Sequence, residues 1–409
     1  MEAFAADITA ARGFLADGGT CGLKASGRRD VGAVISEHPA TAAGTFTSNK
    51  VRAAPVLVCE ELLRRGGGAR AIVFNSGNAN ASTGVKGLEN ARAMQRLLAE
   101  GPGKAHRVSA DGVFVASTGV IGVHLDMAKL ATGIGALAPS RERGSAAVEA
   151  MMTTDTVAKT AAARATAGRT ELTVAGMAKG AAMIAPQMVP HATMLAFIGT
   201  DAAVEARYLQ SVLTAAVEES FNMIVVDGDT STNDTCLLLA NGAAWPEGRA
   251  PLDGSQPECS QFEAALRSVC LRLAQAMARD GEGATKFVEV HVDGAASVAD
   301  ARRVARAIVT SPLTKAAVLG ADPNWGRIAC AAGYSGAALD PLKFDIAIGG
   351  VQVVRAGLAM EYDEGAASAE MKGKEVRLSM HLHLGDGAAT AWGCDLTPEY
   401  VRLNSEYTT

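Results

Sequence analysis

Aromatic side chains are scarce in this chain of 409 residues, where they make up only 4% of the sequence. The core must therefore be packed mainly by alanine, valine, leucine and glycine. An excess of basic residues is also missing, because the formal net charge is −5. Nucleic acid and anionic membranes are poor candidate partners for such a chain, and small polar or zwitterionic substrates fit better. The hydrophobic share of 48% is ample for two large lobes.

Cysteine spacing and the length of the apolar runs exclude further classes of protein. The seven cysteines form no CxxC pair and their number is odd, which favours reduced thiols over a disulfide framework or a zinc site. The N-terminus lacks the basic, apolar and small-residue order of a secretory signal, and no apolar run reaches the length of a membrane span. We therefore expect a cytoplasmic protein.

Helical and strand patterns are mixed along the chain, without the regular alternation of a parallel doubly wound sheet, and indicate a mixed α/β fold. Periodicity predicts helices over 54–65, 86–100, 124–137, 202–220, 261–279 and 298–308. It predicts strands over 71–74, 112–116, 223–226, 235–240 and 285–292, and two strands with a helix between them before residue 178. The C-terminal third is expected to be mostly strand and turn, over 344–354 and 375–384. The glycine- and asparagine-rich segment after Phe74 is expected to be an irregular loop.

The central stretch from Ala178 to Asp201 ends in an apolar run of strand formers, with Thr193 at its head. A lysine, two prolines and a histidine crowd its entrance. On periodicity alone, the run is a buried core strand and the threonine only caps it or packs against it.

Short motifs in this stretch, KGAAMIAP, ATMLAF and TDA, resemble the self-cleavage region of the ornithine acetyltransferase family, the bifunctional glutamate N-acetyltransferases of arginine biosynthesis. Further blocks in family order cover nearly the whole chain: GTFTSNKVRAAPV, NSGNANASTG, ASTGVIG, MMTTDT, VDGDTSTNDT, DGEGATKF, SPLTKAAVLGADPNWGRI and YVRLNSEYTT. The resemblance implies an α/β fold, a layered α-β-β-α sandwich with mixed sheets. It also implies a cut that yields an α chain of residues 1–192 and a β chain of residues 193–409.

The chemistry that the resemblance implies centres on Thr193. A threonine hydroxyl is a weak nucleophile near neutral pH and needs a base within hydrogen-bond reach. Self-cleavage between Ala192 and Thr193 would give Thr193 a free α-amine, with a pKa of about 8, that can take the proton of its own hydroxyl. Thr193 would then accept acetyl from N2-acetyl-L-ornithine and pass it to L-glutamate. No cofactor is needed, because the acetyl ester stores the transfer potential.

By the same resemblance, Thr118 and Gly119 are the oxyanion-stabilising pair. Substrate binding falls to Thr153, Lys179, Thr193, Glu282, Asn404 and Thr409. A lysine suits a substrate carboxylate and a glutamate suits an ammonium group, and Thr154 stays open as an alternative to Thr153. From the residues alone, Ser-Thr-Gly after a strand is an ordinary turn, and a lone lysine or glutamate is usually a solvated surface charge.

One departure from the family pattern precedes the cut, where Val189, Pro190 and His191 separate the MIAP-x-Met segment from Ala192. His191 lies two positions before Thr193 and would share its face in an extended segment. Two interpretations stay open: His191 assists the proton transfers of cleavage, or it is a loop histidine tolerated at a surface.

Three other patterns do not predict a site. His381 and His383 share one face of an expected strand, but no third ligand has a clear spacing, so no metal is expected. The GPGKA segment at 101–105 lacks the hydroxyl residue and the glycine spacing of a phosphate loop. The acidic segment 227–234 lacks the glycine and glutamate of a calcium loop, and is expected to be a turn near the active site.

Rival functions stay open. The enzyme could also take acetyl from acetyl-CoA, and nothing in the sequence decides this. A self-cleaving N-terminal-nucleophile amidohydrolase or aminopeptidase of the same fold would pass the acyl group to water instead. A non-enzymatic amino-acid-binding protein would keep its chain intact. The family resemblance also implies a heterotetramer of two α and two β chains.

Overall fold

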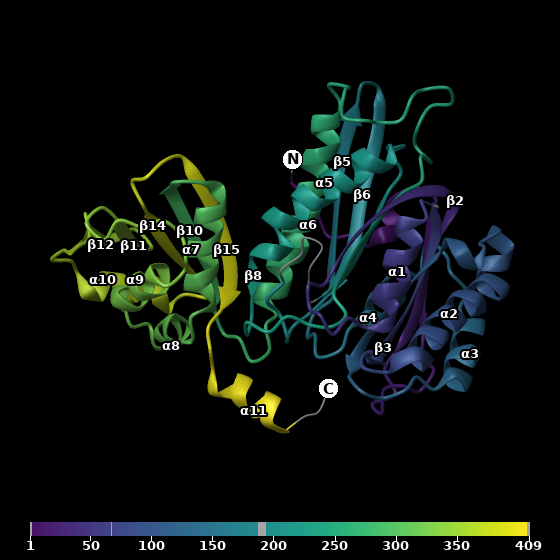
Figure 1. The fold of residues 1–409 in the computed structure, drawn as a ribbon, viewed down its shortest axis with the longest axis horizontal. Coiled ribbons are helices and arrows are strands. Elements are labelled where there is room, and N and C mark those ends of the chain that lie inside the picture. The colour runs from purple at the N-terminus through teal and green to yellow at the C-terminus, as the bar shows by residue number, and fades with distance from the viewer. Residues whose placement is uncertain (1, 67, 187–193, 407–409) are drawn as a thin grey trace.

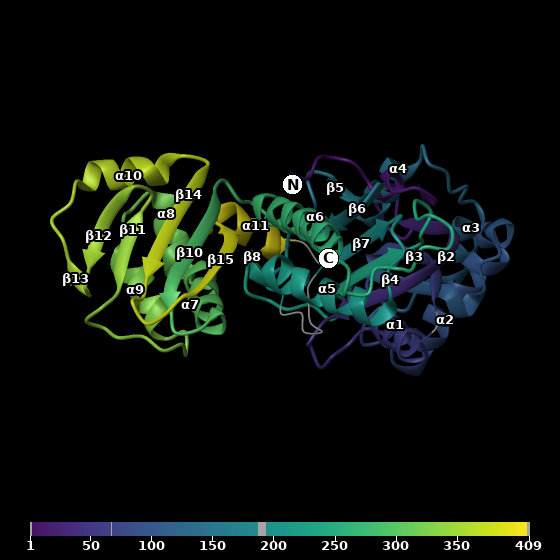
Figure 2. The same cartoon turned by 90° about the horizontal axis from the view of Figure 1, so that it is seen from above.

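The computed structural model describes every residue except 1, 67, 187–193 and 407–409. Two lobes lie side by side, one built from the N-terminal and central parts of the chain and the other from its C-terminal part (Figure 1). Each lobe contains a β-sheet with helices packed against it. Two views show helix α6 (Cys259–Arg279) beside the junction of the lobes (Figure 2). None of the described helices is long and apolar enough to cross a membrane.

The sheet of the larger lobe folds over on itself. Its strand order is β4-β3-β2-β9-β7-β6-β5, and β1 also pairs with β2. The first part of β2 pairs with β3 and the second part with β9, with a break in register after Ile35. The rings of Phe74 on β3 and Phe197 on β7 lie 5.3 Å apart, although strands three places apart would be separated by about 14 Å in a flat sheet. The strands are β1 (Phe14–Gly19), β2 (Val31–Phe46), β3 (Ala69–Asn78), β4 (Val113–Val120), β5 (Lys159–Ala167), β6 (Thr170–Lys179), β7 (Leu195–Thr200) and β9 (Thr235–Ala240).

Helices cover both outer faces of this folded sheet. Helices α5 (Ala206–Glu219) and α6 pack against one face. The other face is covered by α1 (Ala54–Arg64), α2 (Gly84–Glu100) and α3 (Met127–Gly135), while α4 (Gly144–Met151) packs against β1 and β2. Side chains alternate along β7, so Ala196 and Ile198 lie in the core beneath α5 and α6, whereas Leu195 and Phe197 lie in the core shared with β3. The expected α-β-β-α layering is confirmed.

The smaller lobe contains a second mixed sheet, in which β10 pairs parallel with β14 and antiparallel with β15. Its strand order is β13-β12-β11-β14-β10-β15-β8. The strands are β8 (Ile224–Val225), β10 (Phe287–Ala295), β11 (Asp345–Ile348), β12 (Val351–Arg355), β13 (Leu358–Ala359), β14 (Glu375–His381) and β15 (Gly387–Cys394). Helix α7 (Val298–Thr310) packs against β10 and β15. The lobe also contains α8 (Pro312–Gly320), α9 (Trp325–Gly333) and α10 (Glu364–Lys372).

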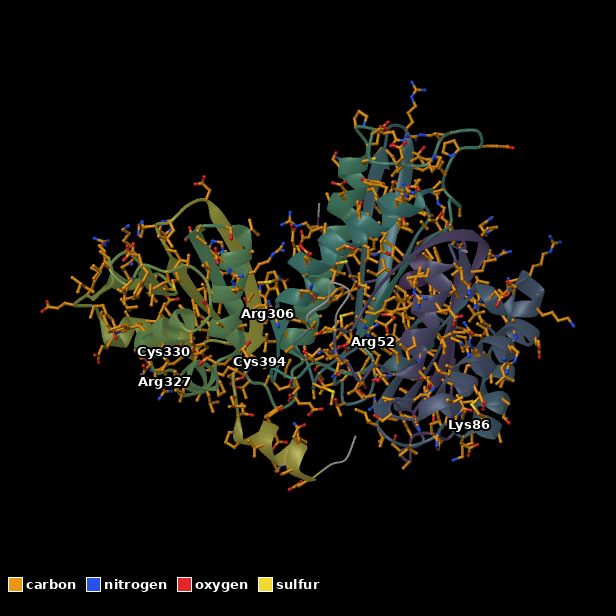
Figure 3. The ribbon with its side chains drawn as sticks, viewed as in Figure 1. Arg52, Lys86, Arg306, Arg327, Cys330 and Cys394 are labelled. Atoms are coloured by element: carbon orange, nitrogen blue, oxygen red, sulfur yellow. The ribbon has the colours of Figure 1, made fainter. Side chains whose placement is uncertain are left out.

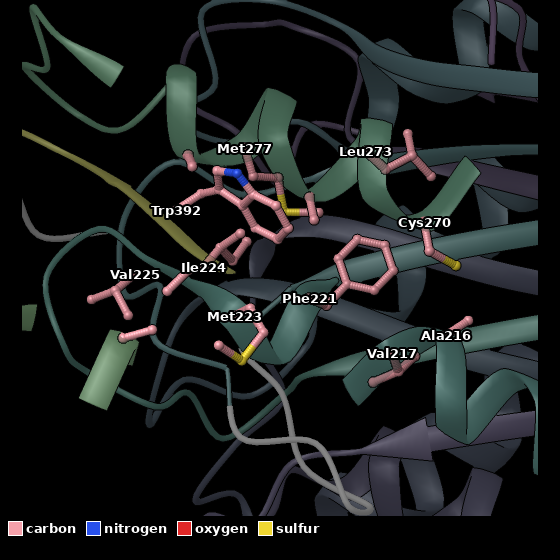
Figure 4. Packing of buried hydrophobic residues seen from close by; sticks show 14 of the residues in the cluster. Ala216, Val217, Phe221, Met223, Ile224, Val225, Cys270, Leu273, Met277 and Trp392 are labelled. Atoms are coloured by element: carbon pink, nitrogen blue, oxygen red, sulfur yellow. The ribbon is translucent and has the colours of Figure 1, made fainter. Parts of the chain in front are cut away.

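A shared core joins the two lobes. Strand β8 follows α5 in the chain, yet its Ile224 pairs with Trp392 at the edge of the smaller lobe's sheet. The Trp392 ring lies among Phe221, Met223 and Met277, which precede strand β10 in sequence and belong to the same buried cluster (Figure 4). After β15 the chain crosses back, and α11 (Pro398–Glu406) lies below the junction (Figure 1).

Most elements expected from periodicity are present, and those at 54–65 and 235–240 have almost the expected bounds. The expectation of mostly strand and turn in the C-terminal third is wrong, because α8 to α11 lie there. Helices α8 and α9 are only nine residues long, which leaves little room for a periodic apolar stripe. The start of α8 did carry a signal, since Ser311 accepts a hydrogen bond from the Thr314 amide and Pro312 occupies the first turn.

Two smaller expectations also need correction. The segment after Phe74 is not irregular from its start, because β3 continues to Asn78 in parallel pairing with β4. Helix α4 precedes the hairpin of β5 and β6 instead of lying between these two strands.

Candidate active site

A pocket of about 160 Å³ opens where segments of both lobes meet. Strands β4, β6 and β7 supply one side, the loop between β8 and β9 supplies another, and α11 closes the third. Six of the residues expected from the sequence line it: Thr118, Gly119, Thr153, Lys179, Glu282 and Asn404. Thr154 lines it as well, so the choice between Thr153 and Thr154 stays open. The expected residues Ala192, Thr193 and Thr409 lie outside the described residues, but Met194, the next residue after Thr193, lines the pocket.

Gly119 occupies a position that only glycine fits. Its φ is 129°, and an added Cβ would lie 2.4 Å from the carbonyl carbon of Gly77 on the neighbouring strand. The register of β3 and β4 shifts at this point, after Ser76 pairs with Thr118. The Thr118–Gly119 segment is therefore an irregular strand end that lines the pocket, and it is not an exposed turn.

Lys179 ends strand β6 with a largely buried side chain that is 8% exposed. Its ammonium donates a hydrogen bond to the Thr118 hydroxyl at 3.4 Å. Burial lowers the pKa of Lys179, while the carboxylates of Asp155, Glu282 and Asp234 act in the opposite direction. Because Lys179 is shielded from water in the pocket, its amino group suits a substrate carboxylate better than that of a solvated lysine would.

Glu282 and Asn404 meet across the pocket. The Asn404 amide donates to the Glu282 carboxylate at 2.9 Å, and the Glu282 backbone N–H donates to the Ala181 carbonyl at 2.9 Å. Helix α11 reaches this place because the Thr397 hydroxyl donates to the Gly283 carbonyl at 2.7 Å. The backbone at Glu282, which is distant in sequence, is therefore joined directly to the motif before the expected cut.

The loop between β8 and β9 contributes residues that were expected only as a nearby turn. The carboxylate of Asp227 accepts hydrogen bonds from the backbone N–H groups of Met183 at 2.6 Å and Ile184 at 2.9 Å. The Asn233 amide donates to the Ser117 carbonyl at 2.8 Å. Burial raises the pKa of Asp234, whose Oδ2 has no hydrogen-bond partner among the described residues. The acidic run marked this segment in the sequence, but its partners are distant along the chain.

The inserted residues Val189, Pro190 and His191 also lie outside the described residues. Pro186 is the last described residue before them. Its carbonyl accepts a hydrogen bond at 2.8 Å from Arg306 of α7, which lies at the junction of the lobes (Figure 3).

The other patterns lie away from the pocket. His381 pairs with Asp293 at 2.8 Å and His383 with Asp345 at 3.0 Å, in the smaller lobe. Among the residues that the structure describes, no group of three or more His, Cys, Asp or Glu side chains is arranged to hold a metal ion. The cysteines are free thiols, with Cys330 exposed on α9 and Cys394 buried at the end of β15 (Figure 3).

The chain is similar to known proteins over its whole length. Residues 15–409 match the model of the ArgJ family. The arginine biosynthesis bifunctional protein ArgJ of Symbiobacterium thermophilum is 48% identical over 413 residues, covering 100% of both chains. Its counterpart in Gloeobacter violaceus is 46% identical over 98% of both. A crystal structure of the arginine biosynthesis bifunctional protein ArgJ from Bacillus halodurans matches with a TM-score of 0.50 and 46% identity, covering 53% of this chain and 100% of that one.

Proposed function

The chain belongs to the ArgJ family, and from this premise we propose that it transfers acetyl from N2-acetyl-L-ornithine to L-glutamate in arginine biosynthesis. The observation that carries the proposal is the convergence of the expected site residues from both lobes in one pocket. The names of the curated relatives agree with an enzyme of arginine biosynthesis. The reaction needs no cofactor, because the acetyl group stays covalently bound throughout.

The nucleophile in this proposal is Thr193, freed by self-cleavage after Ala192 into an α chain of residues 1–192 and a β chain of residues 193–409. Two observations support it. Met194, bonded directly to Thr193, lines the pocket. The solved relative from Bacillus halodurans matches over its whole length while covering only 53% of this chain, which is the share that a β chain beginning at Thr193 would have.

The transfer proceeds in two balanced steps. The Thr193 hydroxyl oxygen attacks the acetyl carbonyl, its proton passes to the Thr193 α-amine, and the bond from the carbonyl carbon to the ornithine nitrogen breaks as that nitrogen takes the proton. The glutamate amine then attacks the acetyl ester, the bond from the carbonyl carbon to the threonine oxygen breaks, and that oxygen takes a proton from the attacking amine through the Thr193 α-amine. Each step passes through an oxyanion, for which Thr118 and Gly119 supply a hydroxyl and a close-lying backbone.

Substrate recognition is divided between the two sides of the pocket. Lys179 is the partner of the α-carboxylate, and Glu282, oriented by Asn404, is the partner of an ammonium group. Thr153 and the terminal Thr409 complete the set in this proposal.

The experiment that tests the function is an assay of the purified protein with N-acetylornithine, in the presence and absence of glutamate. Ornithine and N-acetylglutamate should form in equal amounts when glutamate is present. Steady release of acetate without glutamate would instead identify an amidohydrolase. A parallel incubation with glutamate and acetyl-CoA alone decides whether acetyl-CoA is also a donor, by the appearance of free CoA.

The proposal extends to assembly and location. We expect a heterotetramer of two α and two β chains in the cytoplasm. Native mass spectrometry should find two copies of each fragment in one particle, and a particle with one copy of each would contradict this assembly.

A further inference from the structure

A buried lysine outside the pocket joins two carboxylates that belong to different parts of the larger lobe. Lys159 begins strand β5, and its side chain has no exposed surface. Its ammonium donates to Asp155 at 2.6 Å and to Asp280 at 2.5 Å. Both carboxylates are themselves buried, with 4% and 9% of their residue surfaces exposed.

Asp155 carries this contact to one end of the pocket. One carboxylate oxygen accepts the backbone N–H of Gly180 at 2.7 Å, and the other accepts the backbone N–H of Thr153 at 3.0 Å. Gly180 directly follows Lys179, and Thr153 lines the pocket itself. A single carboxylate therefore fixes two backbone segments that present expected substrate-binding residues.

Asp280 carries the contact to the other end. It ends helix α6, and it accepts the backbone N–H of Thr156 at 3.0 Å as well as the Thr156 hydroxyl. Two residues further along the chain is Glu282, the expected partner of the substrate ammonium group. Lys159 thus links Asp155, which holds the backbone at Thr153 and next to Lys179, with Asp280, which lies two residues before Glu282.

Stability alone does not explain such an arrangement. Removing an ion from water costs several kcal/mol, and well-packed apolar residues can replace buried ion pairs with little loss of stability. The group of one ammonium and two carboxylates has a net charge of −1, which the nearby ammonium of Lys179 offsets. Burial opposes ionisation of Asp155, but Lys179, Lys159 and the N–H donors outweigh it and hold the pKa of Asp155 well below its usual range.

We propose that Lys159 is a positioning residue of the acetyl-transfer site: by joining Asp155 to Asp280, it fixes the spacing between the carboxylate-binding and ammonium-binding ends of the substrate site. This inference rests on the proposed function. It adds that recognition of an amino acid of fixed length depends on a buried bridge that touches no substrate.

The test compares self-cleaved wild-type protein with self-cleaved Lys159→Met, using calorimetric titration with L-ornithine and steady-state assays with N-acetylornithine. Methionine keeps an unbranched side chain but removes the bridge. The dissociation constant for ornithine and the KM for N-acetylornithine should rise roughly tenfold or more, because misplaced binding groups lose complementarity. The kcat should change less than the KM. A lowered Tm with an unchanged dissociation constant and KM would overturn the inference, because that is the result of a purely structural lysine.

Two further variants separate positioning from charge and from general destabilisation. Lys159→Met combined with Asp280→Asn removes one positive and one negative charge, so the net charge is kept while the bridge is lost. This double variant should keep the raised dissociation constant, and its return to the wild-type value would overturn the bridging role. Asp201→Asn alters a buried carboxylate at the far end of β7, which accepts the Thr173 N–H at 2.7 Å, and should lower the Tm without changing ornithine binding.

Different results would overturn the proposed function and the bridging role of Lys159. A wild-type protein that neither binds ornithine nor deacetylates N-acetylornithine would overturn the proposed function, and this inference with it. Wild-type activity together with unchanged ornithine binding in Lys159→Met would overturn this inference alone.

Discussion

Two of the walls that line the pocket are built in different ways. The strand wall, formed by Thr118, Gly119, Lys179 and Met194, lies at strand ends of the larger lobe. The adjoining strand β7 is buried along its whole length. The helix wall consists of Glu282, which follows α6, together with Tyr400 and Asn404 of α11, a helix in which no residue is buried.

The difference matches the demands of the two tasks. Stabilising a developing oxyanion requires groups preset by a packed framework, and the strand wall provides one. Recognition of an ammonium group tolerates a partner that is only partly buried, and α11 is held beside Glu282 by a few hydrogen bonds, from Thr397 to Gly283 and from Asn404 to Glu282. We therefore expect changes at Thr118 and Gly119 to act mainly on kcat, and changes at Lys179 and in the helix wall to act mainly on substrate binding and KM.

The largest effect should come from Thr193→Ala. Without the hydroxyl group the chain should stay intact and inactive, because self-cleavage and transfer use the same oxygen in the proposed mechanism. Denaturing mass spectrometry and N-terminal sequencing of the purified protein check this. Thr193→Ser is the matched control, since it keeps a hydroxyl group and should still be cut. A cleaved and active Thr193→Ala protein would refute the nucleophile assignment.

A change of about a hundredfold in kcat is expected from Gly119→Ala, which is the cost of losing one oxyanion donor. The added Cβ would lie 2.4 Å from Gly77 and must displace this end of the strand wall. Gly122→Ala is the control, because Gly122 also has a positive φ of 83° but has open space at its Cβ position. Unchanged turnover in Gly119→Ala, with ornithine binding intact, would mean that the oxyanion donors lie elsewhere.

In the helix wall, Asn404→Ala should raise the KM for N-acetylornithine roughly tenfold and leave kcat within a few-fold. The lost hydrogen bond to a charged group is worth about 1.5–3 kcal/mol. Ser405→Ala is the control, since the Ser405 hydroxyl donates to the Arg402 carbonyl on the same exposed helix. A fall in kcat without a rise in KM would contradict the expectation that the helix wall acts mainly on substrate binding.

The strands that carry Thr118, Gly119 and Lys179 were largely predictable from the sequence and helix α11 was not, whereas the choice of site residues in both walls came from the family resemblance. Thr118, Gly119 and Lys179 lie in or beside short motifs whose apolar neighbours indicate strands, and the structure confirms those strands. Helix α11 has no buried face, so no apolar periodicity marks it, and the C-terminal third was expected to be strand and turn. The motif alone indicated Asn404.

Contacts between distant segments could not be predicted at all. Lys159 is the first residue of an alanine-rich strand, and nothing in the sequence marks its side chain as buried. Its partner Asp280 is 121 positions away. Asp227 was placed in a turn near the site, but its hydrogen bonds to the Met183 and Ile184 amides depend on how the lobes meet. Periodicity describes elements, whereas the positions of these groups follow from packing between elements.

The pH dependence of binding tests the buried cation of the strand wall. Burial lowers the pKa of Lys179, so its charged form is lost as pH rises, beginning below the ordinary value of about 10.4. The groups that face it are Asp155, Lys159, Glu282 and Asp234, together with Lys24. N-acetyl-L-glutamate is a suitable probe, because it has no group that titrates above about pH 5.

Calorimetric affinity for this probe should fall several-fold between neutral pH and pH 10 in the wild-type protein. Lys179→Met should bind it weakly at every pH, without that fall. An equal fall in both proteins would assign the titration to another group.

The smallest effect is expected from His191→Ala. This variant tests whether the inserted residues before the cut take part in self-cleavage. If His191 is a surface loop histidine, the rate of self-cleavage should change less than about threefold, since a residue outside the proton transfers contributes little to them. If it relays a proton during cleavage, the rate should fall by about a hundredfold or more and lose its dependence on a group titrating near 6.5. Time-resolved mass spectrometry of freshly refolded protein between pH 5 and pH 8 distinguishes the two, and His191→Gln, which keeps a hydrogen-bonding side chain without the titration, separates proton transfer from loop shape.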